Sequence, residues 1–268
     1  HAGQDALNEC MAPYGGFEHN LQSLRVVDEL EERYPAFNGL NLSFETREGI
    51  LKHCARRNAE LLNIQEPGGV AARFLNGTPP SLEAQLCNLA DAIAYNAHDI
   101  DDGVRSGLLT LEQMQDVALF ARYQAQTLAE YPQLQGRRVL YETIRRMLSD
   151  QVYDVISATR IMLDQHQPTS ADDARQGPPL VQFSAAMYEE SKTLKSFLFR
   201  NLYRHPQVMT TTDWARDVVR ALFAIYLNKP DEMPTAYAQQ HDVPRAVADY
   251  LSGMTDRFAT REHARLAV

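Results

Sequence analysis

Apolar residues recur every three or four positions along most of this chain, which is the spacing of one face of an α-helix. No run of alternating β-branched residues, which would indicate a strand, competes with that pattern. The pattern predicts helices over residues 19–34, 81–103, 111–131, 140–163, 184–204, 214–227 and 243–254. We therefore expect an all-α protein.

Three segments between the expected helices are rich in proline, glycine and asparagine, which interrupt helices and form turns. They are residues 34–43, 65–80 and 166–179. The third segment is the strongest candidate for a boundary. The sequence therefore predicts two regions, residues 1–165 and a C-terminal helical region over 166–268, which we expect to pack together as one unit.

The composition is that of an ordinary globular protein, with 44% hydrophobic and 23% charged residues. The formal net charge of −9 argues against a broad nucleic-acid-binding surface, although a nucleotide site needs only a few local cations. The three cysteines form no C-x-x-C pair. The chain also has no apolar run of about 18 residues, the length that crosses a membrane. We expect a cytoplasmic protein without a membrane partner, and the charge does not support nucleic acid as a regulator.

The predicted helix over residues 81–103 carries the most informative polar pattern. Asp91, Tyr95 and Asp99 recur at i, i+4 and i+8, which places them within about 80° of one another on a helix. Carboxylates beside apolar residues such as Ile93 are costly unless a metal ion or a phosphate-bound cation compensates their charge. Acidic residues at helical spacing also commonly form a solvated face, so the spacing alone leaves both interpretations open.

Three long strings of the sequence resemble, in order, the motifs of one family. They are HAGQDALNECMAPYGGFEHNLQSLR at the start, SLEAQLCNLADAIAYNAHDIDDG from Ser81, and RAVADYLSGMTDRFATREH from Arg245. They resemble motifs of bacterial deoxyguanosinetriphosphate triphosphohydrolase-like proteins, which are HD-domain proteins. The resemblance implies a multi-helix HD-domain bundle with a C-terminal helical extension. It also implies metal-dependent hydrolysis of deoxynucleoside triphosphates, dGTP in particular, to deoxynucleoside and triphosphate.

The family holds a divalent metal with a histidine, a His-Asp doublet and a later aspartate. That later aspartate matches Asp91, and a carboxylate on a rigid helix is a suitable ligand for Mg²⁺, Mn²⁺ or another transition metal. The other three ligands lie upstream of His1 in the family, so the complete site is expected to need residues before this sequence begins. The dipeptide formed by His98 and Asp99 follows Asp91 and is not the family's metal doublet. We expect His98 to be structural.

The family implies a catalytic role for the start of the sequence. His1 matches a histidine that takes part in proton transfer, which suits an imidazole near neutral pH. Gln4 stands where the family has a glutamate, and an amide cannot take a proton. The alternative is therefore a catalytically impaired homologue that acts as a nucleotide-binding regulatory or scaffold subunit.

The resemblance also implies contacts to the substrate, a deoxynucleoside triphosphate, and assembly into a homo-oligomer. Lysines are the expected clamps for the triphosphate. For Asn20 a capping or core role is equally consistent with the sequence. The expected substrate-binding residues are Lys52, Lys195, Tyr95, Asp99, Tyr203, His19 and Asn20.

Overall fold

A computed structural model of the chain describes residues 2–266 and divides the chain into two helical units. We call Ser43–His205 the central unit, and His1–Leu42 together with Pro206–Val268 the terminal unit. Between residues 2 and 266 there are helices and two isolated β-bridges but no strand, so the all-α fold is confirmed. The division differs from the expected one at residue 165, because residues 166–205 belong with the central unit.

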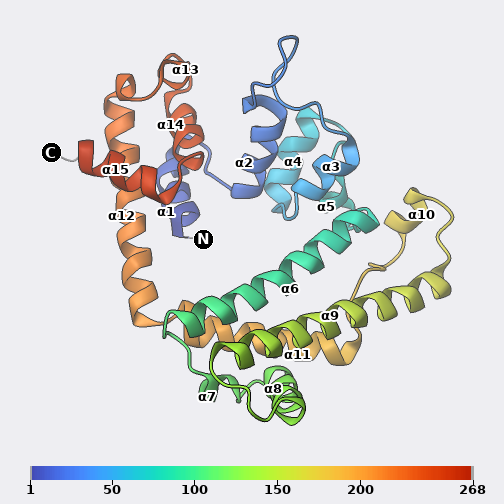
Figure 1. The fold of residues 1–268 in the computed structure, drawn as a ribbon. Coiled ribbons are helices and arrows are strands. Elements are labelled where there is room, and N and C mark those ends of the chain that lie inside the picture. Colours follow the sequence, from blue (N-terminus) through green and yellow to red (C-terminus); the bar gives the residue numbers. More distant parts are fainter. Residues whose placement is uncertain (1, 267–268) are drawn as a thin grey trace. The chain divides into compact units, whose positions relative to one another are not determined.

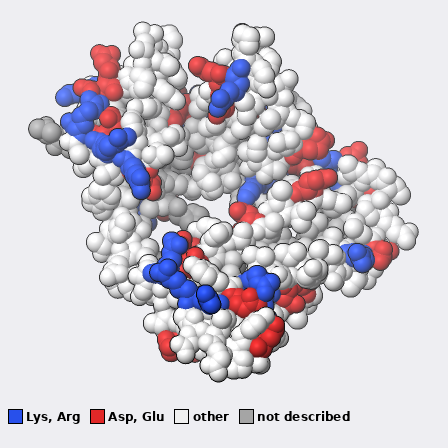
Figure 2. Space-filling model, viewed as in Figure 1, with Lys and Arg blue, Asp and Glu red and all other residues white. Residues whose placement is uncertain are grey.

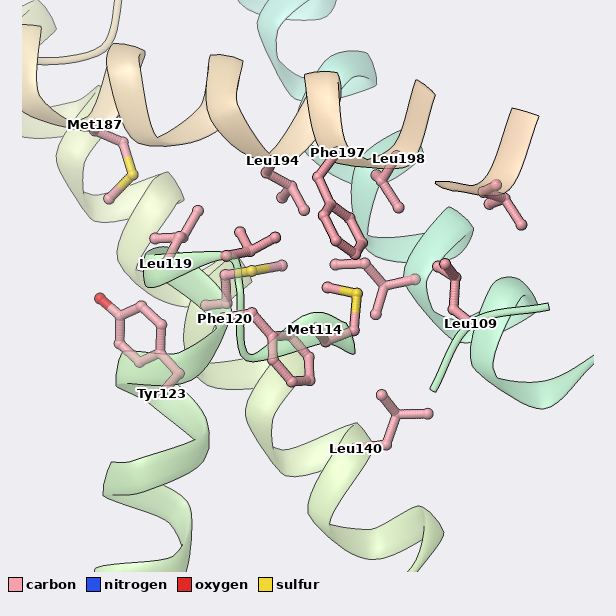
Figure 3. Packing of buried hydrophobic residues seen from close by; sticks show 14 residues of the cluster. Leu109, Met114, Leu119, Phe120, Tyr123, Leu140, Met187, Leu194, Phe197 and Leu198 are labelled. Carbon is pink, nitrogen blue, oxygen red and sulfur yellow. The ribbon is translucent and has the colours of Figure 1, made fainter. Parts of the chain in front are cut away.

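The central unit is built around a few long helices (Figure 1). Its elements are α3 (Phe44–Ile50), α4 (Arg56–Gln65), α5 (Ala72–Asn76), α6 (Leu82–Arg105), α7 (Leu111–Met114), α8 (Ala118–Glu130), α9 (Arg137–His166), α10 (Ala171–Gln176), α11 (Ala185–Leu198) and a π-turn (Phe199–Tyr203). Figure 3 shows Met114, Phe120, Leu194 and Phe197 pointing toward one another in its core. Burial of such side chains supplies the main driving force for packing these helices together.

The terminal unit joins segments from both ends of the chain. Its elements are α1 (Ala2–Met11), a 3₁₀ turn (Ala12–Tyr14), α2 (His19–Arg25), a π-turn (Val26–Leu30), α12 (Pro206–Asn228), a second 3₁₀ turn (Pro230–Glu232), α13 (Thr235–Ala238), α14 (Val243–Ser252) and α15 (Asp256–Leu266). Helix α12 packs against α1, α14 and α15, and Met11, Leu222, Tyr226 and Val247 lie in the shared core. None of the helices within 2–266 is long and apolar enough to span a membrane.

The predicted helix over 111–131 is wrong as one element, because the chain turns between α7 and α8. Thr110 and Gln113 form a capping box at the start of α7. The backbone N–H of Val117 then bonds to the carbonyl of Met114, and Val117 and Met114 are both buried in the core. Burial of these two side chains outweighs continuous helical hydrogen bonding, a tertiary effect that periodicity does not contain. The expected loops over 65–80 and 166–179 likewise contain the short helices α5 and α10.

Gly103, expected to end its helix, lies inside α6 for a packing reason. A Cβ at this position would lie 2.7 Å from Leu109 Cδ1 and 3.3 Å from Leu202 Cδ1, and both leucines are buried. Helix α6 runs on to Arg105. The glycine thus allows the loop after α6 to pack against the helix.

We expect Gly103→Ala to lower the free energy of unfolding by about 1–3 kcal/mol, because the added methyl overpacks a filled core. Chemical denaturation measures the change. Gly3→Ala is the matched control, since Gly3 is also helical but no atom lies within 4 Å of its added Cβ. The control should be neutral or stabilising by up to about 1 kcal/mol. Equal effects of the two substitutions would contradict the packing role.

Candidate functional site

Helix α6 carries the stripe of Asp91, Tyr95 and Asp99 along one side. Ser81 caps the helix as predicted, accepting a hydrogen bond from the backbone N–H of Ala84 at 3.3 Å. The Asp91 side chain is 67% exposed, whereas Asp99 is only partly exposed. The expectation that these acids lie among buried apolar residues is therefore wrong for Asp91. Only Asp99 is buried enough for its charge to need compensation.

Lys52 meets the stripe at Asp91. Its Nζ lies 3.0 Å from Asp91 Oδ2. Glu48, a buried carboxylate on α3, accepts a hydrogen bond from the backbone N–H of Ser81 at 3.0 Å and so ties α3 to the start of α6. Arg73 donates a hydrogen bond to the carbonyl of Leu51 at 2.7 Å. These contacts hold the segment after α3 beside α6, which brings together two residues that the sequence assigned to the same site.

Tyr203 meets the other end of the stripe. Its hydroxyl donates a hydrogen bond to Asp99 Oδ2, and its ring centroid lies 6.5 Å from that of Tyr95. Burial raises the pKa of Asp99 above its ordinary value. Burial and the neighbouring Asp99 also raise the pKa of Tyr203. The sequence predicted that these residues face a nucleotide, but it did not predict their contact, which depends on the π-turn after α11.

The pH dependence of folding stability tests the surroundings of Asp99. Because its pKa is raised in the folded state, the folded protein retains the Asp99 proton that the unfolded chain releases near pH 3.8. Retention of this proton adds to the free energy of unfolding. That contribution is lost as pH rises from about 4 through the pKa of Asp99 in the folded protein.

We expect Asp99→Asn, which resembles the protonated acid and still accepts from Tyr203, to gain stability relative to the native protein between about pH 4 and pH 7. Urea denaturation at the two pH values measures the difference. Asp102→Asn is the control, because Asp102 is exposed on the same helix. A stability difference for Asp99→Asn that shrinks with rising pH would contradict the argument.

Lys195 and His98 are exposed, and their side chains do not take part in these contacts. Lys195 lies on α11, eight residues before Tyr203, and its side chain makes no hydrogen bond or ion pair with another residue of 2–266. No three His, Cys, Asp or Glu side chains in that range are arranged to hold a metal ion. The residues described therefore do not fit a metal site by themselves, since Asp91 contributes a single carboxylate that is engaged by Lys52.

The remaining predicted site residues belong to the terminal unit. His1 lies outside the described residues. Gln4 is half-buried on α1, and His19 is exposed with its Nδ1 3.0 Å from Glu18 Oε1. Asn20 is buried and donates to the same Glu18 oxygen at 2.8 Å, while Glu18 caps α2. Asn20 is thus a buried partner of the Glu18 cap, in agreement with the core role that the sequence left open.

Gln22 and Arg25, in the first family motif, contact Asp249 in the third. Gln22 Nε2 donates to Asp249 Oδ1 at 2.8 Å, and Arg25 donates from Nε at 3.1 Å and from Nη2 at 3.0 Å. The Asp249 side chain has no exposed surface. This charge-assisted network, which the sequence did not reveal, is a structural reason for both motifs.

Figure 2 shows acidic side chains beside basic ones on the visible face, without an uninterrupted basic stripe. Ion pairs such as Arg122 with Glu190 at 2.6 Å and Arg220 with Glu9 at 2.7 Å neutralise several arginines. The local cation of the stripe on α6 is Lys52.

The C-terminal segment matches a known domain. Residues 181–265 match the family model of the phosphohydrolase-associated domain. The match places this helical segment among phosphohydrolase-associated domains.

Similar proteins identify the family. A deoxyguanosinetriphosphate triphosphohydrolase-like protein of Bordetella pertussis is 57% identical over 272 residues, which cover 99% of this chain and 70% of the relative. Proteins of the same description from Ralstonia nicotianae and Nitrosomonas europaea are 55% and 50% identical. Each match covers 99% of this chain, and the matches cover 68% and 70% of the two relatives, respectively. The chain belongs to the deoxyguanosinetriphosphate triphosphohydrolase-like family, as its three motifs predicted.

Proposed function

We propose that this chain carries the substrate-binding part of a hydrolase that converts deoxynucleoside triphosphates, dGTP in particular, to deoxynucleoside and triphosphate. One observation carries the proposal: side chains from two separate segments of the central unit converge on the stripe of α6. Lys52 reaches Asp91, and Tyr203 reaches Asp99 and Tyr95. The names of the related proteins support the substrate class.

The arrangement offers a cation for phosphate and acceptors for a sugar. A triphosphate oxygen can replace the exposed Asp91 carboxylate on Lys52, because an ion pair so open to water is weak. Lys195 would add a second cation near the phosphates. Asp99, an acceptor held by Tyr203, suits a sugar hydroxyl, and Tyr95 can donate to phosphate or sugar.

The proposed chemistry is attack of water on the α-phosphorus. The bond from that phosphorus to the sugar oxygen breaks, triphosphate keeps the water oxygen, and the deoxynucleoside oxygen takes a proton. We assign proton transfer to His1, while His19 is proposed to border the nucleotide. A divalent metal belongs to the proposal, with Asp91 as one ligand. Because the described residues supply no further ligands, we derive no step through the metal.

Product analysis on the native protein tests this proposal. We expect equal amounts of deoxyguanosine and triphosphate from dGTP in the presence of Mg²⁺ or Mn²⁺, separated by anion exchange. Oxygen from labelled water should appear in the triphosphate and not in the deoxyguanosine. Release of a nucleoside monophosphate, or of single phosphates, would contradict the proposed bond cleavage.

Gln4 favours a second candidate, a nucleotide-binding regulatory or scaffold subunit with impaired catalysis. Under the hydrolase proposal, Gln4→Glu supplies a carboxylate that can orient and charge a neighbouring histidine, so we expect kcat to rise at least about tenfold. Gln113→Glu, which makes the same change in the central unit, is the control. Tight dGTP binding without turnover in either the native protein or Gln4→Glu would favour the regulatory subunit.

A further inference from the structure

Arg73 on α5 holds the backbone on both sides of Lys52. Its Nη2 donates hydrogen bonds to the carbonyl oxygen of Leu51 at 2.7 Å and to that of Lys52 at 3.3 Å. The first oxygen belongs to the peptide group before the Lys52 Cα, and the second belongs to the peptide group after it. Because peptide groups are planar, holding both of them sets the direction in which the Lys52 side chain leaves the backbone.

The segment around Lys52 has little regular structure of its own. Helix α3 ends at Ile50 and α4 begins at Arg56, so the two carbonyls lie outside both helices. Leu51 is fully buried, and a buried carbonyl without a partner is costly. The flexible Lys52 side chain is 35% exposed and meets a carboxylate that is itself exposed. The backbone therefore contributes most of the order that places the Lys52 amine.

Arg73 is itself fixed by the structure around it. Val70, just before α5, is buried, and the Arg73 guanidinium lies 3.9 Å from the centroid of the Phe74 ring. At the end of α4, both carboxylate oxygens of Glu66 accept hydrogen bonds from Arg47 of α3, at 2.9 and 2.8 Å. These contacts fix both ends of the turn that leads into α5, so Arg73 is a firm support for the backbone.

The guanidinium of Arg73 is held at a cost to folding. Its Nε is buried and makes no hydrogen bond with another residue between positions 2 and 266. Burial lowers the pKa of Arg73 below its ordinary value, and the carboxylate of Glu48 opposes that effect only in part. A partly buried charge with an unpaired donor adds little to stability, but its planar group fixes geometry well. These properties suit a residue that serves the geometry of its neighbours.

We propose that Arg73 is a positioning residue for Lys52, which holds the lysine amine at the α6 stripe where the triphosphate binds. The inference rests on the proposed function, in which Lys52 is the cation for phosphate. Arg73 acts through the main chain and not on the substrate, because its Nη2 is engaged by two carbonyls and its guanidinium packs against Phe74. A displacement of about 1 Å in a catalytic group can cost about 10²-fold in rate.

A double-mutant cycle on the native protein tests the effect on turnover. Arg73→Met keeps the apolar stem and removes the donors, so we expect kcat for dGTP to fall at least about tenfold while KM changes less than about threefold. In a Lys52→Ala background the same substitution should change kcat less than about twofold, since the lysine that it positions is gone. Equal losses in the two backgrounds overturn the proposal, because a general structural role acts whether or not Lys52 is present.

Two further variants complete the cycle. Arg57→Met is the matched control, because Arg57 is an exposed arginine on α4, within the segment that Arg73 closes, and it should leave kcat unchanged. Arg73→Lys retains a cationic donor and should lose less activity than Arg73→Met. A thermal melt verifies folding, and Arg73→Lys takes the place of Arg73→Met in the cycle if the latter does not fold.

Hydrogen exchange measures the positioning without turnover. In the native protein the backbone N–H of Leu51 donates to the carbonyl of Arg47 at 3.0 Å, and that of Lys52 donates to Ile50 at 2.9 Å. We expect both amides to exchange at least about tenfold faster in Arg73→Met than in the native protein or Arg57→Met, while amides of α9 keep their rates. Unchanged exchange at both amides overturns the proposal.

The two measurements separate this inference from the proposed function. Absence of dGTP turnover in the native protein would contradict the proposed function, and the exchange rates would still decide whether Arg73 holds Lys52. Faster exchange in Arg73→Met with unchanged kcat would leave the proposed function intact and overturn the role of Arg73.

Discussion

Replacing Lys52 by alanine is expected to lower kcat/KM for the proposed hydrolysis of dGTP by about 10²–10³-fold. Lys52 is the cation that meets the carboxylate stripe of α6, with its Nζ 3.0 Å from Asp91 Oδ2. A positioned cation stabilises the negative charge that develops on the triphosphate more strongly in the transition state than in the bound substrate. The loss should therefore appear mainly in kcat.

The fold of the Lys52→Ala variant should survive. The Asp91 side chain is 67% exposed, so this ion pair contributes no more than about 1 kcal/mol to stability. Steady-state kinetics with dGTP measures the activity, and a thermal melt verifies folding. Lys192→Ala is the matched control, because Lys192 is an exposed lysine on α11 that pairs with Glu189 at 3.5 Å. An unchanged kcat/KM for Lys52→Ala would contradict this role and would show that Lys52 only forms a surface ion pair.

Replacing Arg25 by methionine is expected to lower the free energy of unfolding by about 3–5 kcal/mol. The substitution leaves the carboxylate of Asp249 buried with Gln22 as its remaining partner. A buried charge that loses its counter-ion retains the full cost of its removal from water.

Urea denaturation of the native protein measures this effect, with two comparisons. Arg33→Met is the control, because Arg33 is 70% exposed and pairs with Glu31 on the surface. It should change stability by no more than about 1 kcal/mol. The double variant Arg25→Met with Asp249→Leu removes both charges and should be more stable than Arg25→Met alone. A double variant less stable than the single one would contradict the role assigned to the pair.

Much of the local structure was visible in sequence patterns. The period of 3.6 residues identified the long helices, and Ser81 marked the start of α6 because a serine side chain can accept from the free backbone N–H groups of the first turn. The stripe of Asp91, Tyr95 and Asp99 followed from spacing within one helix, since positions four apart share a face whatever surrounds them. The three ordered motifs identified the family.

Contacts between distant segments needed the tertiary structure. Asp249 lies 224 positions after Arg25, and Tyr203 lies 104 positions after Asp99, so no helical period relates either pair. The break between α7 and α8 depends on which side chains the core buries, as Val117 and Met114 show. The sequence by itself thus determined the helices, the stripe and the family, because these depend on neighbours along the chain. Only the tertiary structure decided which charges meet and which surfaces stay open, because that depends on how the helices pack.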